Sequence, residues 1–401
     1  MDSANIIISE YKKTPVVCGF INDKMEYLSL VRESELNKIY IGKVDHVVKN
    51  LDAAFVKIGT DNIGYLSLKN LVKACITAKN SRADAIIKAG DEVLVQVDSE
   101  AVKSKKCKLT TGISLSGKYS VVTLGRNGVG TSVKLDDDLR KKLTELTKDR
   151  LTELTNEYRD KLYGEDCGFI IRTNAADLFK GQDNLESSDF TDLFVEDARQ
   201  VLDRLCEILK SSRSRTIYSC LYSPVSMGDD QEDLLTLNIK KAGAFLKVRG
   251  YSDPEIIKDS GIHGIPSKID SLRSNKIWLK SGAFLIIEQL ESFNAIDVNT
   301  GKAIKGKKDI SYEVNLEAAD EIMRQVRLRN LTGMILIDFI NMKDPSEYEK
   351  LTEHIKQLCR LDPVHTSFVD ITGLGIMELI RNKNDKTLKE ILQEVENSVD
   401  I

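Results

Sequence analysis

Residues 276–383 alternate between strand-like and helix-like segments, and this pattern limits the possible folds more than any other feature of the sequence. Strands are expected where apolar and polar residues alternate, and helices where apolar residues recur every three or four positions. The pattern predicts two adjacent strands, a helix, a strand, a helix, and a strand leading into a helix, in the segments 276–301, 315–330, 333–341, 344–362 and 366–383. Such alternation indicates a layered α/β architecture.

Two of the predicted strands reach an aspartate after a run of apolar residues. Asp297 follows Ala295 and Ile296 in "FNAIDVNTG", and Asp338 follows Ile337 in "MILIDFINM". An ionised carboxylate close to a core is unfavourable unless it is paired or holds a metal ion. In open α/β sheets, ligands bind at the carboxyl ends of the strands. The two aspartates are therefore candidate functional residues.

Two converging carboxylates and the amide of Asn299 would form an all-oxygen site. Mg²⁺ and Mn²⁺ prefer such ligands and keep waters that phosphate oxygens can replace. The bound ion can activate a water and offset charge on a phosphodiester. The following segment offers lysines that can hold flanking phosphates, namely Lys302, Lys305, Lys307 and Lys308.

The alternative for each aspartate is a salt bridge with a buried arginine, for instance Arg324 or Arg327. One isolated acid on a strand favours that explanation, because structural ion pairs are common. Two acids in nearly identical surroundings bring the two explanations close to even. The pattern alone does not decide between them.

Residues 36–118 alternate with the period of half-buried strands and are punctuated by glycines, so they predict an all-β module. In "AAFVKIG", the small and branched residues share one face, which leaves Phe55 and Lys57 on the other. Tyr65, across a turn, is expected on the same face as Phe55. An outward aromatic pair beside lysines is suited to stacking nucleic-acid bases. The equally weighted alternative is that Phe55 and Tyr65 fill a second core layer.

The segments between residues 119 and 275 are less regular. Two short strands around a glycine-rich turn are expected at 116–135, and a polar helix with a narrow leucine stripe at 136–162. A strand ending in Arg172 and Thr173 and an amphipathic helix at 189–212 come next. Further strands are predicted at 215–223 and 244–250, followed by a polar, loop-rich region at 250–275.

Composition excludes several classes of protein. The seven cysteines include no C-x-x-C pair, and none of the four histidines lies at metal-ligand spacing from another, so neither a zinc site nor a disulfide framework is expected. The net charge of −4 excludes a uniformly basic nucleic-acid binder, but binding depends on where positive charge lies. No apolar run approaches the roughly 20 residues that span a bilayer, and the first residues do not resemble a signal peptide. We expect a cytoplasmic protein without a membrane segment.

Several collinear blocks resemble the catalytic region of the ribonuclease E/G family. The most distinctive are "AIDVNTGK", "NLEAADEIMRQVRLRNLTGMILIDFINM" and "GLGIMELIRNK", at residues 295–302, 315–342 and 373–383. Two more lie in the predicted β module and just after it, at residues 37–68 and 109–119. The resemblance is spread over most of the chain, which makes it more specific than a short motif.

This resemblance implies an α/β multidomain fold, in which an RNase H-like subdomain is interrupted by an S1 domain, an OB-type β-barrel. The RNase H-like parts would be residues 1–35 and 213–278, and the S1 domain residues 36–118. A 5′-sensor region would follow at 119–212, and a DNase I-like catalytic subdomain at 279–401.

The resemblance also implies roles for individual residues. The family's metal-binding aspartates fall on Asp297 and Asp338, and its active-site asparagine falls on Asn299. Its RNA-binding aromatic pair and lysine in the S1 domain fall on Phe55, Tyr65 and Lys105, and Lys302 adds a cation near the active site. The residues that would sense a 5′-monophosphate are Gly117, Val121, Arg172 and Thr173. An arginine fork beside a hydroxyl is suited to gripping a terminal phosphate.

Two features differ from the family pattern. Arginines that the family often carries in the sensor align with Val133, Lys134 and His365, so the preference for a 5′-monophosphate is expected to be weaker or lost. No C-P-x-C zinc link follows "MELIRNK", and residues 384–401 contain no cysteine. We therefore expect no zinc and no zinc-linked dimer, but either a monomer or self-association through another surface.

The implied activity is hydrolysis of single-stranded RNA with Mg²⁺, or with Mn²⁺ in its place, to products with 5′-phosphate and 3′-hydroxyl ends, in RNA processing or decay. One alternative is an RNA-binding protein of the same fold that cuts weakly or not at all. Another is a metal-dependent phosphatase or a nuclease acting on DNA, which leaves the S1-like module unexplained. The paired aspartates favour the ribonuclease.

Overall fold

The structure is a computed structural model, and the chain forms two compact units. The first, here called the outer unit, comprises Met1–Glu33 and Glu232–Ile401, and the second, the inserted unit, comprises Ser34–Gln231. The structure describes residues 3–60, 62–77, 87–101, 106–132, 135–175, 187–224, 233–302, 310–383 and 385–399.

The inserted unit begins with a closed β-barrel. Its strands follow the order β4-β5-β6-β8-β7, and β7 pairs with β4 to close the ring; their bounds are β4 (Ile39–Val48), β5 (Ala53–Lys57), β6 (Ile63–Ser67), β7 (Glu92–Ser99) and β8 (Cys107–Thr110). Alternate residues such as Val56 and Val95 fill the interior and are fully buried. The barrel confirms the prediction of an OB-type module.

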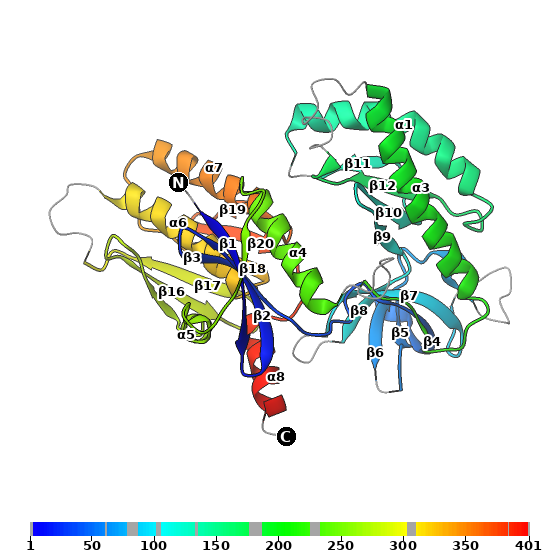
Figure 1. The fold of residues 1–401 in the computed structure, drawn as a ribbon, viewed down its shortest axis with the longest axis horizontal. Coiled ribbons are helices and arrows are strands. Elements are labelled where there is room, and N and C mark those ends of the chain that lie inside the picture. Colours follow the sequence, from blue (N-terminus) through cyan, green and yellow to red (C-terminus); the bar gives the residue numbers. More distant parts are fainter. Residues whose placement is uncertain are drawn as a thin grey trace. The chain divides into compact units, whose positions relative to one another are not determined.

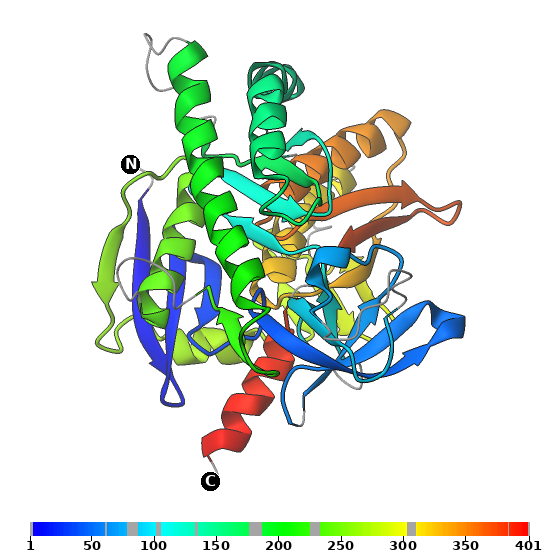
Figure 2. The same ribbon diagram turned by 90° about the vertical axis from the view of Figure 1, so that its right-hand side faces the viewer.

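The rest of the inserted unit is a four-stranded sheet with helices. The sheet order is β11-β12-β10-β9, from strands β9 (Ser114–Ser116), β10 (Ser120–Leu124), β11 (Val129–Thr131) and β12 (Cys167–Ile171). The predicted strands on either side of the glycine-rich turn are β10 and β11, and β12 lies between them. Helices α1 (Asp137–Tyr158) and α3 (Ser187–Ser211) pack together over this sheet (Figure 2). Helix α3 also contacts β13 (Cys220–Tyr222), a short strand that pairs with β4 of the barrel.

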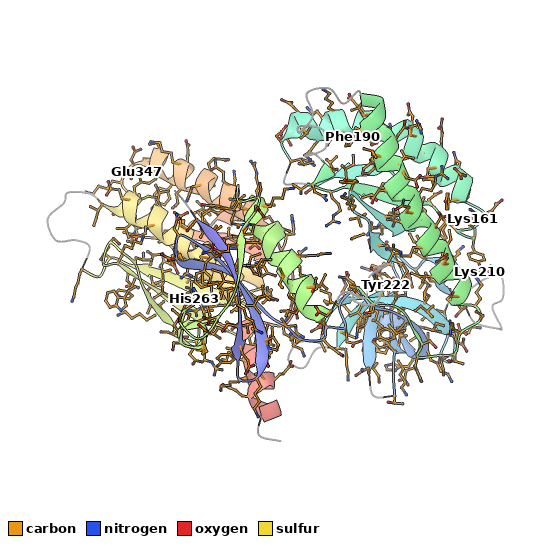
Figure 3. The ribbon with its side chains drawn as sticks, viewed as in Figure 1. Lys161, Phe190, Lys210, Tyr222, His263 and Glu347 are labelled. Carbon is orange, nitrogen blue, oxygen red and sulfur yellow. The ribbon has the colours of Figure 1, made fainter. Side chains whose placement is uncertain are left out.

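Sequence signals account for these two helices. Asp136 caps α1, because its Oδ1 accepts the Leu139 N–H at 2.9 Å. Phe190 of α3 is buried, whereas Lys161 and Lys210 are exposed on the same unit (Figure 3). The leucine stripe of α1 packs into the same core as Phe190. The helices predicted at 136–162 and 189–212 are thus confirmed.

The first sheet of the outer unit is covered on both faces. Its order is β14-β1-β2-β3, from β1 (Ala4–Tyr11), β2 (Thr14–Ile21), β3 (Lys24–Leu30) and β14 (Glu255–Lys258). Ile6 and Val17 pack against helix α4 (Leu234–Lys247), while Ile7 and Val16, on the opposite face, pack with helices α5 (Ile265–Ser271) and α8 (Leu388–Val399).

Two predictions in this region are wrong. The strand expected at 244–250 is instead the end of α4. The buried residues Ala242, Phe245 and Leu246 follow the helical i, i+3, i+4 spacing. This spacing cannot be recognised within the seven residues 244–250 alone. The expected loop region at 250–275 contains β14 and α5.

The second sheet of the outer unit carries the candidate aspartates. Its order is β15-β16-β17-β18-β20-β19, from β15 (Lys276–Trp278), β16 (Phe284–Gln289), β17 (Asn294–Asn299), β18 (Gly333–Asp338), β19 (Thr366–Ile371) and β20 (Ile376–Arg381). Helices α6 (Ser311–Leu328) and α7 (Pro345–Leu361) cover one face (Figure 1). That face is apolar: Ile296, Ile335 and Ile337 are buried against the helices.

The sequence prediction for this sheet needs two corrections. The segment 276–301 forms three strands rather than two. The segment 366–383 forms the hairpin β19–β20 rather than a strand and a helix. Gly375 adopts φ +85° in the connecting turn, which favours glycine, and Met377 and Leu379 alternate inward with the period of a strand.

The other face of this sheet, here called the open face, carries half-buried and exposed side chains. Because side chains alternate along each strand, the open face is formed by Lys276, Trp278, Phe284, Ile286, Glu288, Ala295, Asp297, Asn299, Met334, Leu336, Asp338, Ile376, Glu378 and Ile380.

Helix α6 is joined to strand β3 by a partly buried ion network. Glu321 accepts bonds from Arg324 Nη2 at 2.6 Å and from Gln325 Nε2 at 2.8 Å, and Lys24 Nζ lies 2.9 Å from its other oxygen. Burial alone would raise the pKa of Glu321, but these partners outweigh it and lower the pKa to about 2.

Glu321→Gln is expected to lower the free energy of unfolding at pH 7 by about 3 kcal/mol, the value of the pKa shift between unfolded and folded chain. Because the folded pKa of Glu321 is depressed, its contribution is present above the ordinary pKa and is lost as the pH falls from about 4.5 towards about 2. Urea titrations of both proteins across this range should show the difference shrink. A difference that stays constant down to pH 2.5 would contradict this role.

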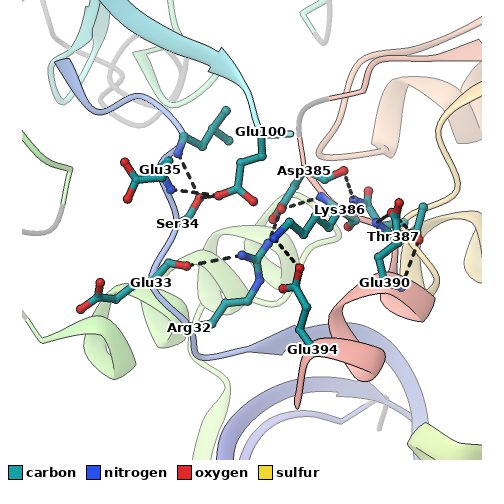
Figure 4. Close-up of polar contacts among 12 residues, drawn as sticks. Arg32, Glu33, Ser34, Glu35, Glu100, Asp385, Lys386, Thr387, Glu390 and Glu394 are labelled. Carbon is teal, nitrogen blue, oxygen red and sulfur yellow. Dashed lines mark hydrogen bonds and ion pairs between the residues drawn. The ribbon is translucent and has the colours of Figure 1, made fainter. Parts of the chain in front are cut away.

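The last helix, α8, is fixed at its start by a capping box. Thr387 N and Oγ1 both donate to Glu390 Oε2, at 2.9 and 2.8 Å. Arg32 pairs with Asp385, and Lys386 Nζ lies 2.5 Å from Glu394 Oε1 (Figure 4). These contacts hold the apolar face of α8 on the first sheet. No helix in the described part of the chain is both long and apolar enough to span a bilayer.

Candidate active site

Asp297 and Asp338 are partners in the ladder between the two central strands of the second sheet. Strands β17 and β18 are parallel, and Asp297 pairs in register with Asp338. Neighbouring strands lie about 4.8 Å apart, and register partners point to the same face. Both aspartates are exposed on the open face. Residues forty-one positions apart in the chain thus present adjacent carboxylates.

Asn299 completes this cluster. It lies two residues after Asp297 on the same face of β17, and its Nδ2 donates to Asp297 Oδ2 at 2.6 Å. This bond orients the Asp297 carboxylate and leaves the amide oxygen of Asn299 available as a further ligand. The structure therefore brings together the three residues that the sequence singled out.

The salt-bridge alternative is wrong. Arg324 binds Glu321, and Arg327 Nη2 lies 2.6 Å from Glu26 Oε2. Within the described residues, neither Asp297 nor Asp338 forms an ion pair with an arginine. The supposed burial of the two carboxylates is wrong as well, because both are exposed. Two like charges in adjacent register positions repel each other, and a shared cation would relieve this repulsion.

An open groove of about 260 Å³ passes over the two aspartates. Its lining is largely apolar and includes Ile286, Leu336 and Ile376. Its charged members are Glu288, Asp297 and Asp338. No group of three His, Cys, Asp or Glu side chains in the described residues could hold a metal ion. The oxygen donors fit a hard ion such as Mg²⁺, which binds through one or two carboxylates and keeps waters that phosphate oxygens replace.

Lys302 follows β17 and is exposed at the end of this site. Its backbone N–H donates to Gly282 O at 3.0 Å, in the turn between β15 and β16. The other three lysines predicted to flank the site, Lys305, Lys307 and Lys308, lie outside the described residues.

The predicted aromatic pair lies on the outside of the barrel. Phe55 and Tyr65 are register partners on β5 and β6, with ring centroids 6.0 Å apart in an edge-to-face arrangement. Both are half-buried, while their neighbours Ala54 and Val56 fill the barrel core. The alternative of a second core layer is wrong for the described residues, because neither ring belongs to a core cluster or packs against one.

The sequence did not identify His46 as part of this surface. The ring of His46 stacks on Phe55 at 4.8 Å between centroids, and Tyr65 pairs with Lys108 on β8. A bulge between Val44 and His46 places the histidine opposite Phe55, and a bulge of this kind leaves no clear sequence signal. Lys105 lies outside the described residues.

Two of the four predicted sensor residues are in direct contact. Arg172 Nη1 donates to Gly117 O at 2.5 Å, and the guanidinium is exposed. Thr173 Oγ1 donates to Ser132 Oγ at 3.0 Å. Val121 lies on β10 and pairs with Ile170 of β12.

The sequence also missed Asp197, which fixes the loop at Gly117. Its carboxylate accepts the backbone N–H groups of Lys118, Tyr119 and Ser120 at 2.7–3.0 Å. A Cβ at Gly117 would lie 2.5 Å from Asp197 Oδ2, so the close approach of this carboxylate requires glycine.

The positions where the sequence departs from the family pattern are only partly described. Val133 and Lys134 lie outside the described residues, and His365 is exposed just before β19. The backbone carbonyl of His365 accepts the Asn382 N–H at 2.9 Å.

The chain is similar in sequence to proteins of one family. A sequence model of the Ribonuclease E/G family matches residues 231–384. Ribonuclease G of Escherichia coli K12 is 28% identical over 392 residues, which cover 90% of this chain and 75% of that protein. Ribonuclease G of Haemophilus influenzae is 26% identical over 385 residues, which cover 89% of this chain and 74% of that protein. Ribonuclease E of Escherichia coli K12 is 29% identical over 89% of this chain and 34% of its own length.

Proposed function

Because the chain belongs to the ribonuclease E/G family, we propose that it is an endoribonuclease that hydrolyses single-stranded RNA with a divalent metal ion. One observation carries the metal-dependent part of the proposal, namely the register pairing of Asp297 with Asp338. Two exposed carboxylates on adjacent strands, with no arginine partner among the described residues, are suited to sharing one cation.

In the proposed reaction, the carboxylates of Asp297 and Asp338 would hold Mg²⁺, or Mn²⁺ in its place. The ion would supply activation of a water and compensation of charge on the scissile phosphate. Asn299 holds Asp297 in a fixed orientation through its 2.6 Å hydrogen bond. Lys302 offers a charge for a neighbouring phosphate. Hydrolysis with the 3′ oxygen as leaving group gives a 5′-phosphate and a 3′-hydroxyl.

The barrel surface supports single-stranded RNA as the substrate. The rings of His46, Phe55 and Tyr65 form a continuous row, and aromatic rings bind unpaired bases by stacking without strong preference for one base. We assign no base specificity. Arg172 and Thr173 would contact a 5′-monophosphate, with a preference weakened by the absence of further sensor arginines. The reaction would take place in the cytoplasm.

The test is incubation of the purified protein with an unstructured, 5′-monophosphorylated RNA and Mg²⁺. Cleavage that EDTA stops and that Mg²⁺ restores is expected, with 3′-hydroxyl ends on the products. A contaminating metal-independent ribonuclease would leave 2′,3′-cyclic phosphates and would not respond to EDTA. The matched DNA oligonucleotide should remain intact, and cleavage of both would favour the general nuclease. RNA binding without any cleavage would leave only the RNA-binding alternative.

A further inference from the structure

The open face carries a second group of side chains beside the candidate carboxylates. We propose that Trp278 and Phe284, together with Lys276, form a base-stacking subsite for a nucleotide close to the scissile phosphate. This subsite deepens the proposed function and rests on it for the identity of the bound strand. It differs from the barrel surface, because it belongs to the sheet that carries Asp297 and Asp338.

Strand register places this group on the same face as the carboxylates. Trp278 pairs with Phe284, and Phe284 pairs with Asn299, so the three side chains form one row across β15, β16 and β17. The adjacent row begins with Lys276 and continues through Ile286 to Asp297 and Asp338. The aromatic pair is therefore directly continuous with the carboxylate pair.

The distance between the two groups suits an RNA strand. Trp278 is two strands away from Asn299, or about 10 Å at ordinary strand spacing. One or two nucleotides of an extended strand span such a distance. A phosphate at Asp297 and Asp338 would then place a neighbouring base over the rings.

The rings and the ammonium group form a compact cluster. The centroids of Trp278 and Phe284 are 5.2 Å apart, with the planes inclined by 58°. Lys276 Nζ lies 3.8 Å from the Phe284 centroid and 4.4 Å from that of Trp278. Cation–π attraction holds the ammonium group over the rings, where it can also meet a phosphate.

Trp278 does not serve the core of the unit. Its side chain is 57% exposed, whereas the preceding residue, Ile277, points inward and packs on the apolar core. Trp278 is the single tryptophan of the chain. An indole held open to solvent beside a second ring and a cation has the composition of a stacking platform for single-stranded nucleic acid.

Charge around the platform also fits a polyanion. Lys276, Lys280 and Lys302 are all exposed, and the backbone of Lys302 is joined to the β15–β16 turn through Gly282. Lys276 is thus in contact with the rings, while Lys280 follows Trp278 by two residues and Lys302 is joined by its backbone to the same turn. An apolar protein partner would have no use for these charges, which favours a nucleic-acid strand.

Because Trp278 is the single tryptophan, its fluorescence reports directly on this site. The wild-type protein is titrated in EDTA, where cleavage is expected to stop, with a short unstructured RNA and with an abasic chain of equal length and charge. RNA is expected to quench the emission, and the abasic chain to have little effect because it cannot stack.

Two substitutions of Trp278 distinguish binding by ring stacking from binding by apolar surface alone. Trp278→Leu is expected to weaken binding of fluorescently labelled RNA about tenfold, equivalent to about 1.4 kcal/mol, as for the loss of one stacked base. It should raise KM in Mg²⁺ with little change in kcat. Trp278→Phe keeps a ring and should stay within about twofold of wild type. Ile262→Ala, at an exposed loop position in the same unit, is the control for a surface substitution.

The outcomes distinguish this subsite from the proposed function. Quenching by RNA without any cleavage would support the platform and contradict the nuclease. Normal cleavage together with equal RNA affinity for wild type and Trp278→Leu would overturn the platform and leave the nuclease standing. Equal quenching by the abasic chain would also overturn it, as would an RNA-free dimer that dissociates in Trp278→Leu, since the surface would then bind a second copy.

Discussion

Asp338→Asn is expected to lower the rate of Mg²⁺-dependent RNA cleavage by roughly 10²–10³-fold or more, the scale for losing a group that stabilises transition-state charge. The substitution keeps the size of the side chain but removes one of the two charges that would hold the cation. Asp297→Asn should have a similar effect and should also disturb the bond from Asn299. Single-turnover cleavage of an unstructured RNA measures both rates.

The same variants should not be less stable than wild type. Asp297 and Asp338 are like charges in paired register positions, and such pairs are destabilising by roughly 0.2–1 kcal/mol. In EDTA, the unfolding temperature of Asp338→Asn should equal or exceed that of wild type. Mg²⁺ should raise the unfolding temperature of wild type only.

Asp370→Asn is the matched control. Asp370 is an exposed acid on the edge strand β19 of the same sheet, and its substitution removes the same charge without touching the pair. Its cleavage rate should stay close to that of wild type. If Asp338→Asn cleaved as fast as Asp370→Asn, the shared-cation site would be disproved.

The second large effect is expected from a buried ion pair behind the same sheet. Arg381 and Asp362 are almost fully buried, with Nε to Oδ2 at 2.9 Å and Nη2 to Oδ1 at 3.1 Å. Arg381 Nη1 also donates to Asn330 Oδ1 at 2.6 Å and to Leu331 O at 3.1 Å. The pair thereby joins β20, the end of α7 and the turn that leads into β18.

Asp362→Ala is expected to lower the free energy of unfolding by about 3–5 kcal/mol, because it leaves the Arg381 guanidinium buried without its counter-charge. Urea unfolding followed by Trp278 fluorescence reports on the outer unit alone, since this residue is the single tryptophan.

The double variant Asp362→Leu with Arg381→Met should recover part of the loss, since it removes both charges. Glu394 forms a more exposed ion pair with Lys386. Glu394→Gln should therefore lower the free energy of unfolding by less than about 1 kcal/mol. A loss for Asp362→Ala as small as that for Glu394→Gln would show that the buried pair contributes little.

The sequence predicts the central part of the site because its signals are local. Apolar alternation followed by an acid marks the second half of β17 and the end of β18. The intervening helical pattern favours parallel neighbouring strands. Asp297, Asn299 and Asp338 could therefore be placed together without a structure. Their exposure could not be predicted, because an alternating strand does not show whether its second face is covered.

What the sequence did not predict depends on contacts between distant segments. His46 meets Phe55 through a bulge, and Asp197 meets the loop at Gly117 across eighty positions of the chain. The sequence favours a strand and a helix where the β19–β20 hairpin lies, because "GIMELIRNK" has the composition of a helix. The alternation of buried and exposed side chains along β20 becomes apparent only when the strand is seen paired in the sheet. No sequence signal singles out Trp278, since only the register with Phe284 and Asn299 shows its neighbours.

The two acids belong to one strand–helix–strand unit, because β17, α6 and β18 are consecutive elements in the described part of the chain. Their spacing is set by ladder hydrogen bonds between adjacent strands rather than by docking of separate bodies. Rearrangement elsewhere in the molecule can change which substrate binds and how it is held, but it leaves the spacing between the Asp297 and Asp338 carboxylates unchanged. Regulation of such a protein would therefore act through substrate access rather than through assembly of the carboxylate pair.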